Sequence, residues 1–151
     1  MNKDCFSCNF KDDEKFIVLR TKYWKIAVLD DQAYIGHCVV VSLNHREALA
    51  ELTKEEWEDF GVLQKKFEPA MKKAFDSPLL NWSCLMNSDF RKKVPMHVHW
   101  HVVARIEEPI VVNGVKFEDY NLGYHYDVKL KKLVDKKTKE TLADMIRKEI
   151  K

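Results

Sequence analysis

The sequence lacks long apolar runs and an excess of either charge. The sequence contains no run of about 18 apolar residues, the length that could span a bilayer. The first ten residues, MNKDCFSCNF, lack the apolar centre of a signal peptide. The 26 Lys and Arg residues nearly balance the 24 Asp and Glu residues, so a net charge of +2 provides no general attraction to nucleic acid or membrane. We therefore predict a cytoplasmic protein with neither a nucleic-acid polymer nor a membrane as partner.

Repeats and low-complexity linkers are also absent. With 151 residues, 46% of them apolar and 33% charged, the chain fits one globular domain with a sizeable core. The four cysteines are not expected to form a disulfide framework in a reducing cytosol.

The order of apolar patterns predicts an α+β protein with a mainly antiparallel sheet. Thr53 and Glu56 form a capping box that begins a long helix, and Asp76-Ser77-Pro78 ends it. A hairpin turn is expected at Asn113-Gly114. The other expected elements are strands at 16–20, 23–29, 37–43, 80–86 and 96–105, a helical segment at 45–52, a basic loop at 90–95 and a final helix from 138 to about 150.

Three of the six histidines occupy every second position of one predicted strand, in the run HVHWHVV at 97–103. Side chains alternate across a strand, so His97, His99 and His101 are expected on one face. One metal ion does not suit all three, because Cα atoms four residues apart on a strand lie roughly 13 Å from each other. Imidazole can attack a phosphorus atom or transfer a proton, so the row favours chemistry on phosphate esters or anhydrides. A chance arrangement on a solvated strand is the alternative.

The CxxC pair formed by Cys5 and Cys8 is a weak signal by itself. It is compatible with a redox pair, half of a zinc site or two unrelated thiols. No βαβ pattern follows it, which disfavours a thioredoxin-like role. Cys38 and Cys84 lie within apolar strands and are expected to be core thiols.

The run at 97–103 resembles the His-φ-His-φ-His-φ-φ signature of the histidine-triad (HIT) superfamily of nucleotide hydrolases and transferases. The likeness covers about residues 5–106, with IGHCVVVSLNHREALAEL at 35–52 and NWSCLMNSD at 81–89. Within the superfamily, the pattern resembles the diadenosine tetraphosphate hydrolase-like branch. This resemblance implies a HIT-like fold: one domain, residues 1–151, with a five-stranded antiparallel sheet, one long helix and one short helix. A helical C-terminal extension at about 107–151 matches no signature.

The resemblance also implies roles for individual residues. The middle histidine, His99, would attack the α-phosphorus and form a nucleotidyl-histidine intermediate. His101 would contact the leaving group, and Asn87 would supply a further hydrogen-bond donor.

Other residues would bind the substrate. His37 matches a histidine beside the triad, and Asp30 or Gln32 lies in the turn that binds the ribose hydroxyls in the family. The Gly-Gln-Ser/Thr run of some members is replaced here by RKKVP. In that segment, Lys92 and Lys93 would either hold the distal phosphates of a polyphosphate or belong to a solvated loop.

Zinc and a second copy of the chain are the other implied partners. Relatives with an N-terminal CxxC bind zinc, and the matching ligands here are Cys5, Cys8, His45 and His97, a closed structural site. Superfamily members pair as homodimers through the long helix. The helix predicted here carries an apolar stripe for such a contact, made of Trp57, Phe60, Leu63, Gln64, Phe67 and Met71.

The sequence therefore predicts a hydrolase that cleaves the α-phosphate linkage of dinucleoside polyphosphates such as diadenosine tetraphosphate. A nucleoside phosphoramidate hydrolase and a nucleotidyltransferase or phosphorylase are alternatives that would use the same nucleophile. An alternative of another class is a nucleotide-binding sensor or scaffold without significant turnover.

Overall fold

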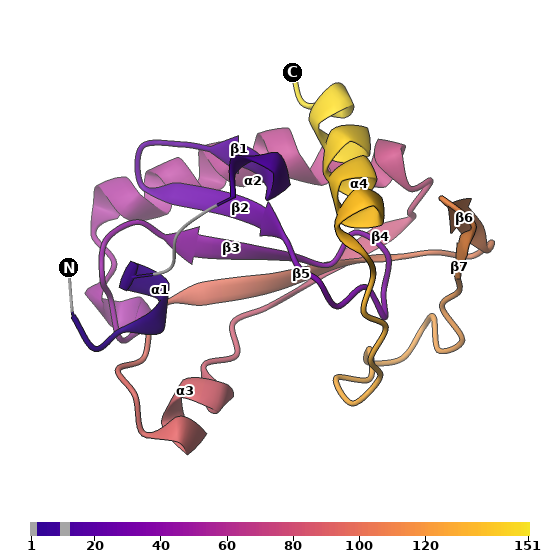
Figure 1. The fold of residues 1–151 in the computed structure, drawn as a ribbon. Helices are drawn as coiled ribbons and strands as arrows, with labels where there is room; N and C mark the ends of the chain where they lie inside the picture. The colour runs from indigo at the N-terminus through magenta and orange to yellow at the C-terminus, as the bar shows by residue number, and fades with distance from the viewer. Residues whose placement is uncertain (1–2, 10–12) are drawn as a thin grey trace.

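A five-stranded antiparallel sheet forms the centre of the protein (Figure 1). The computed structural model describes residues 3–9 and 13–151. The strands lie in the order β1-β2-β3-β5-β4, and a separate hairpin consists of β6 and β7. Their bounds are β1 Ile17–Arg20, β2 Trp24–Val28, β3 Cys38–Ser42, β4 Leu79–Ser83, β5 His99–Arg105, β6 Ile110–Val112 and β7 Val115–Phe117. The predicted α+β class and antiparallel sheet are confirmed.

Four α-helices accompany the sheet in the described part of the chain: α1 (Phe6–Asn9), α2 (Lys54–Ala74), α3 (Asn87–Lys92) and α4 (Lys136–Glu149). The long helix α2 begins as predicted. Thr53 Oγ1 accepts from the Glu56 amide at 3.2 Å, and Glu56 Oε2 accepts from the Thr53 amide at 2.8 Å. None of the described helices combines the length and the apolar character that crossing a bilayer requires.

The core lies between the sheet and the helices α2 and α4, which pack against each other and against the sheet. On the sheet, the face opposite the histidines is apolar, as expected. Trp100 of β5 packs on Phe60 of α2 with ring centroids 4.5 Å apart, and Trp24 of β2 lies 5.5 Å from Trp100. This packing fixes the strand that carries the histidines.

Four local predictions were wrong. The fourth strand ends at Ser83 rather than Met86, so Cys84 lies outside it and is only partly buried. The segment 45–52 is not helical except for one short 3₁₀ turn, Leu49–Glu51, because the Arg46 carbonyl accepts from Val98 and cannot serve a helix. The first half of the expected loop at 90–95 belongs to the end of α3, which runs over 87–92. The fifth strand begins at His99 rather than Met96, so His97 lies before it.

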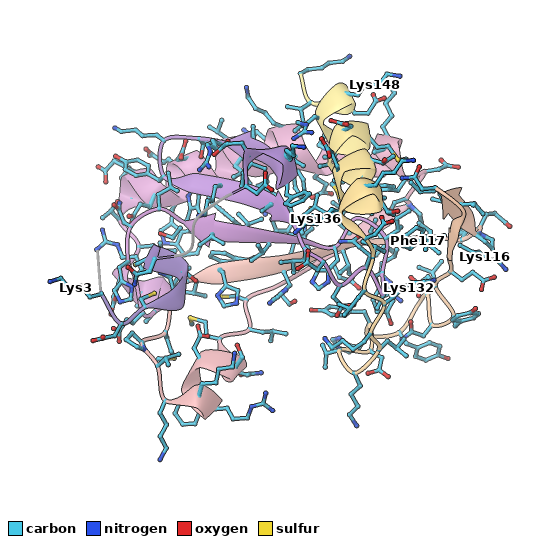
Figure 2. The ribbon with its side chains drawn as sticks, in the orientation of Figure 1. Lys3, Lys116, Phe117, Lys132, Lys136 and Lys148 are labelled. Carbon is cyan, nitrogen blue, oxygen red and sulfur yellow. The ribbon has the colours of Figure 1, made fainter. Side chains whose placement is uncertain are left out.

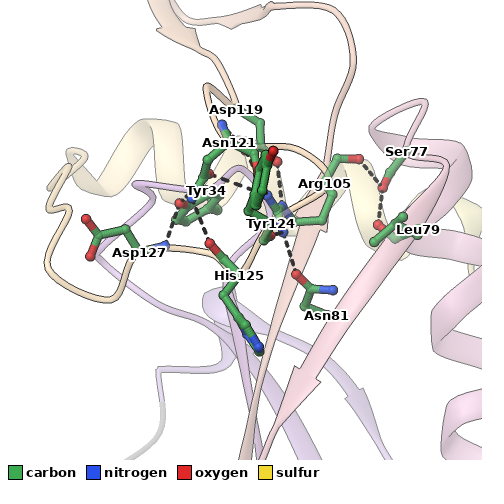
Figure 3. Close-up of polar contacts among 10 residues, drawn as sticks. All are labelled: Tyr34, Ser77, Leu79, Asn81, Arg105, Asp119, Asn121, Tyr124, His125 and Asp127. Carbon is green, nitrogen blue, oxygen red and sulfur yellow. Dashed lines mark hydrogen bonds and ion pairs between the residues drawn. The ribbon is translucent and has the colours of Figure 1, made fainter.

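A long connection between β7 and α4, residues 118–135, crosses the end of the sheet, and we call it the C-terminal strap. Arg105, which is 1% exposed, holds it by an ion pair with Asp119 at 2.5 Å and by donating to the carbonyls of Asn121 and Tyr124, each at 2.8 Å (Figure 3). Arg105 also donates to Asn81 Oδ1 of β4 at 2.7 Å. One buried guanidinium thus joins the strap to two strands.

The other end of the strap is fixed on the hairpin and on the turn before β3. Lys132 lies over the Phe117 ring, 5.1 Å from its centroid, and donates to the Lys116 carbonyl (Figure 2). Backbone hydrogen bonds join Gln32 to Lys132 at 2.8 Å and Val134 to Asp30 at 3.0 Å. The strap is therefore tied to the fold along its length.

The turn before His37 offers a test of this packing. Gly36 has a φ of +68°, and a Cβ there would lie 2.4 Å from Phe75 Cε2. Gly36→Ala should therefore lower the free energy of unfolding by about 2–5 kcal/mol in urea denaturation. In Gly61→Ala of α2 the new Cβ meets nothing within 4 Å, so this control should gain up to about 1 kcal/mol. A small change at both positions would contradict this account.

Candidate functional site

Three histidine rings meet where β3 pairs with β5. His37 Nε2 lies 3.0 Å from His101 Nδ1, and the rings of His99 and His101 have centroids 5.3 Å apart. The predicted row of three is divided, because His97 lies before the strand and its ring enters a second cluster described below. The structure therefore brings together His37, His99 and His101.

The hydrogen bonds assign the ring protons, because a carbonyl oxygen can only accept. His99 Nδ1 lies 2.6 Å from the His97 carbonyl and donates to it, which leaves a lone pair on His99 Nε2. His37 Nδ1 donates to the Asp31 carbonyl at 3.0 Å, so His37 Nε2 accepts from His101 Nδ1. A neutral His101 then also has its lone pair on Nε2.

Burial keeps the paired rings neutral. Desolvation, with the charges of His37, His99 and Lys131, lowers the pKa of His101 to about 4. Burial also lowers the pKa of His37, although its hydrogen bond to Asp31 acts in the other direction. At neutral pH, His101 therefore offers an acceptor and not a proton.

A cavity of about 520 Å³ opens in front of His37 and His101. Three other segments complete its walls: the turn that precedes β3, the segment from the end of β4 into α3, and the C-terminal strap. Besides the two histidines, its lining residues are Asp31, Ala33, Tyr34, Leu85, Asn87, Ser88, Arg91, Tyr126, Asp127, Val128, Leu130 and Lys131. The cavity mixes apolar, aromatic and charged side chains of both signs.

The predicted residues from the segment before the triad are only partly in this cavity. Asn87, the first residue of α3, lines it, as does Arg91. Lys92 does not line it, and Lys93 lines a separate surface depression with Phe90. The helix α3 explains the difference, because successive residues of a helix point in different directions.

The two residues predicted for the ribose have other partners in the structure. Gln32 is fully buried, and its side chain bonds the backbone of Leu29 and His37, which holds the turn. Asp30 is paired with Lys139 at 2.7 Å and does not line the cavity. The neighbouring Asp31 does line it, and the polar turn is the only sequence signal that could have pointed to it.

Cys5, Cys8, His45 and His97 form the second cluster, which we call the cysteine–histidine cluster. Their ligand atoms all lie within 4.8 Å of one another. The Sγ–Nδ1 distances are 3.3 Å for Cys5–His97 and 3.5 Å for Cys8–His45, and the two Nδ1 atoms are 3.4 Å apart. A tetrahedral ion with bonds of about 2.3 Å to sulfur and about 2.0 Å to nitrogen separates its ligands by roughly 3.3–3.8 Å. The three distances given fall in this range, and the cluster could therefore hold a metal ion.

The outer nitrogens of this cluster have partners that aim the inner ones. His97 Nε2 donates to the Ser42 carbonyl at 2.8 Å, and His45 Nε2 lies 3.1 Å from Glu47 Oε1. Each Nδ1 therefore keeps its lone pair for a ligand, which is the arrangement that metal-binding histidines require.

The fold and the paired histidine clusters define an α+β protein whose site is built from imidazole. The chain belongs to the HIT domain family, whose profile matches residues 11–108. Members of this family are typically nucleotide hydrolases or transferases. No curated protein sequence matches the chain.

Solved structures show the same HIT-like fold at low sequence identity. A histidine triad protein from Sinorhizobium meliloti has a TM-score of 0.69 at 16% identity, covering 94% of this chain and 98% of that one. Diadenosine triphosphate hydrolase from Plasmodium falciparum gives 0.66 at 17%, covering 93% and 79%. A zinc-bound histidine triad protein from Mycobacterium smegmatis gives 0.57 at 13%, covering 88% and 81%. The predicted superfamily and fold are confirmed.

The lowered pKa of His101 predicts a pH dependence of stability. The unfolded ring titrates at 6.5 and the folded ring at about 4, so between these values the unfolded chain binds more protons and acid destabilises the fold. His101 should contribute at most about 3 kcal/mol to this loss.

We expect His101→Gln to reduce the drop in unfolding free energy between pH 7 and pH 4.5, measured by urea denaturation. His125→Gln, at an exposed histidine on the strap, should retain the wild-type drop. An unchanged drop in His101→Gln would contradict the assignment.

Proposed function

We propose that the protein is a nucleotide hydrolase that cleaves the α-phosphate linkage of dinucleoside polyphosphates such as diadenosine tetraphosphate. The observation that carries this proposal is the His99 ring, whose Nδ1 donates to the His97 carbonyl and whose Nε2 keeps its lone pair. His99 does not itself line the cavity, but its ring centroid lies 5.3 Å from that of His101, which does. Such a ring attacks as a neutral nucleophile without first losing a proton.

In the first step, His99 Nε2 forms a bond to the α-phosphorus while the bond to the bridging oxygen breaks. The leaving phosphate takes the electron pair. In the second step, a water oxygen attacks the same phosphorus, the P–N bond breaks and its electron pair returns to Nε2. His101 Nε2, an acceptor in the neutral ring, can accept a hydrogen bond from that water. Its lowered pKa of about 4 means that the proton passes on to solvent.

The state of His101 favours an anhydride over a phosphoramidate. A polyphosphate leaves as a stable anion and needs no proton, whereas an amine leaving group must be protonated. His101 has no proton on Nε2 to give. Arg91 on the cavity wall supplies positive charge for the departing phosphates in the role that we had predicted for Lys92 and Lys93.

Transfer of the nucleotidyl group to another acceptor remains an alternative, because only the second step would change. A sensor or scaffold that binds nucleotide without turnover is the alternative outside enzymology. Both differ from the proposal in one observable, the release of free mononucleotide into water. The cytoplasmic location stays a proposal.

His99→Ala should abolish release of AMP from diadenosine tetraphosphate, a loss of at least about a thousandfold in kcat, with an unchanged melting temperature. Acid-free gel analysis with labelled substrate should detect a covalent adduct on the wild type and none on the variant. His125→Ala, at a histidine outside both clusters, should keep activity and adduct. Label on His99→Ala would refute the nucleophile, and AMP binding without turnover in the wild type would favour the sensor.

We also propose that the ion of the cysteine–histidine cluster is zinc. Two thiolates and two imidazoles form the donor set that zinc prefers, and four protein ligands leave no open position, as in structural sites. Zinc would join the N-terminal segment at Cys5 and Cys8 to the turn at His45 and to the residue before β5. Its chemistry there is structural stabilisation, since the hydrolytic steps use other residues.

Protein purified without added metal or a histidine tag should contain about one zinc per chain by elemental analysis. Cys8→Ser should lower that content by at least about half and lower the melting temperature, because metal binding contributes to folding. Cys84→Ser is the matched control, since Cys84 lies outside the cluster. Wild-type protein with no zinc, and with a melting temperature unaffected by chelator, would overturn the proposal.

We propose that the protein forms a homodimer, although the contact cannot use the whole apolar stripe predicted on the long helix. Most of the predicted stripe is used inside the chain, since Phe60, Phe67 and Met71 are buried. Trp57 remains 41% exposed on α2, and Leu79 is equally exposed on β4, an edge strand of the described sheet. An edge strand and adjoining apolar side chains suit pairing with a second copy.

Light scattering at micromolar concentration should therefore give about twice the chain mass of 17.9 kDa. Trp57→Glu should shift the mass toward the monomer, because the charge would be buried at the interface. Lys65→Glu, at an exposed position of the same helix, should leave the mass unchanged. A wild-type mass of one chain would overturn the dimer.

A further inference from the structure

Five residues of the cavity lining come from the C-terminal strap, and these are Tyr126, Asp127, Val128, Leu130 and Lys131. The strap lies beyond residues 11–108, the part of the chain that the family profile covers. One whole wall of the cavity is therefore built by a segment to which the family match assigns nothing.

The strap is placed firmly enough to act as a wall. Arg105 holds its first part through Asp119 and the carbonyls of Asn121 and Tyr124 (Figure 3). The Tyr34 hydroxyl, beneath that guanidinium, donates to Asn121 Oδ1 at 2.9 Å and accepts from the Asp127 amide at 2.7 Å. Tyr126 lies between the anchored residues Tyr124 and Asp127 in the sequence, and it lines the cavity.

Tyr126 is fixed at both ends of its side chain. Its hydroxyl bonds the Ser83 hydroxyl at the end of β4, and its ring packs edge-on against Tyr34 with centroids 5.6 Å apart. Ser83 lies directly opposite His101 in the sheet. The result is a half-buried aromatic ring, held rigidly beside the catalytic histidines, with part of its surface open to the cavity.

The charges of the cavity favour a nucleoside over the polyphosphate tail at this wall. Asp31 and Asp127 balance Arg91 and Lys131, and Lys131 is already paired with Asp31 at 2.8 Å. The strap adds Val128 and Leu130, which are apolar. An aromatic ring among apolar side chains is a surface on which a base stacks. Any of the bases can do so, because each has a flat aromatic face.

We propose that Tyr126 is a substrate-binding residue: it stacks on the base of the nucleotide whose α-phosphate His99 attacks. This assignment rests on the proposed function for the identity of the ligand. Because the ring is already immobilised by Ser83 and Tyr34, stacking a base on it costs little conformational entropy.

The test compares two probes by calorimetry: AMP, and ribose 5-phosphate, which lacks the base. Tyr126→Ala should weaken AMP binding by at least about tenfold and ribose 5-phosphate binding by less than about twofold. Tyr126→Phe keeps the ring and should bind AMP within about threefold of the wild type. Tyr124→Ala, at an 80% exposed tyrosine of the same strap, should leave both affinities unchanged.

Equal losses for both probes in Tyr126→Ala would mean that the ring only shapes the cavity, and the proposal would fail. Unchanged AMP affinity, or wild type that does not bind AMP, would overturn it as well. The proposed chemistry fails in a different way: AMP binds and responds to Tyr126→Ala, but no adduct forms on His99.

Discussion

The hydrogen bond from His37 to the Asp31 carbonyl determines which ring nitrogens of His37 and His101 carry protons. A carbonyl accepts only, so it fixes the proton on His37 Nδ1, and His37 in turn fixes the proton on His101 Nδ1. The lone pair on His101 Nε2 is therefore set by the Asp31 carbonyl, acting through His37. The turn that supplies this carbonyl is held by Gln32, which donates to the His37 carbonyl, and by Gly36, which packs closely on Phe75. Residues with a structural role therefore determine where the ring protons lie.

His97 links the two clusters of the protein. Its side chain belongs to the cysteine–histidine cluster, and its backbone carbonyl accepts from His99 Nδ1. An ion that held this ring would also hold the carbonyl, so the orientation of the proposed nucleophile His99 would depend on the ligands of the cluster without any contact between His99 and the ion. At the other end of β5, Arg105 holds the strap, and one strand thus connects the cysteine–histidine cluster, His99 and the cavity wall.

Sequence patterns predicted those parts of the structure that depend on near neighbours. The capping box at Thr53, the alternation along β5 and the hairpin at Asn113-Gly114 are set by local geometry. The segment at 45–52 could not be read in this way, because its backbone serves a distant strand. The pairing of His37 with His101 and the cysteine–histidine cluster could be anticipated only through the family resemblance, since Cys5 and His97 are 92 positions apart.

The remaining site residues were out of reach for specific physical reasons. Arg91 and Lys92 are adjacent in sequence, and only the helical turn of α3 decides which one lines the cavity. Tyr126 has no motif, and its position depends on a buried arginine that composition cannot distinguish from a surface one. Long-range polar contacts of this kind have no periodicity in the sequence.

The residues proposed for recognition and for reaction lie in different parts of the chain. The proposed nucleophile, its orienting carbonyl and the cysteine–histidine cluster all lie within the first two thirds of the sequence, whereas the cavity wall with Tyr126 follows them as one continuous segment anchored on Arg105 and Tyr34. An insertion or exchange between these anchors would alter which molecules enter the cavity and leave the reacting groups in place. In evolutionary terms, a protein of this plan can diverge in substrate without losing its chemistry.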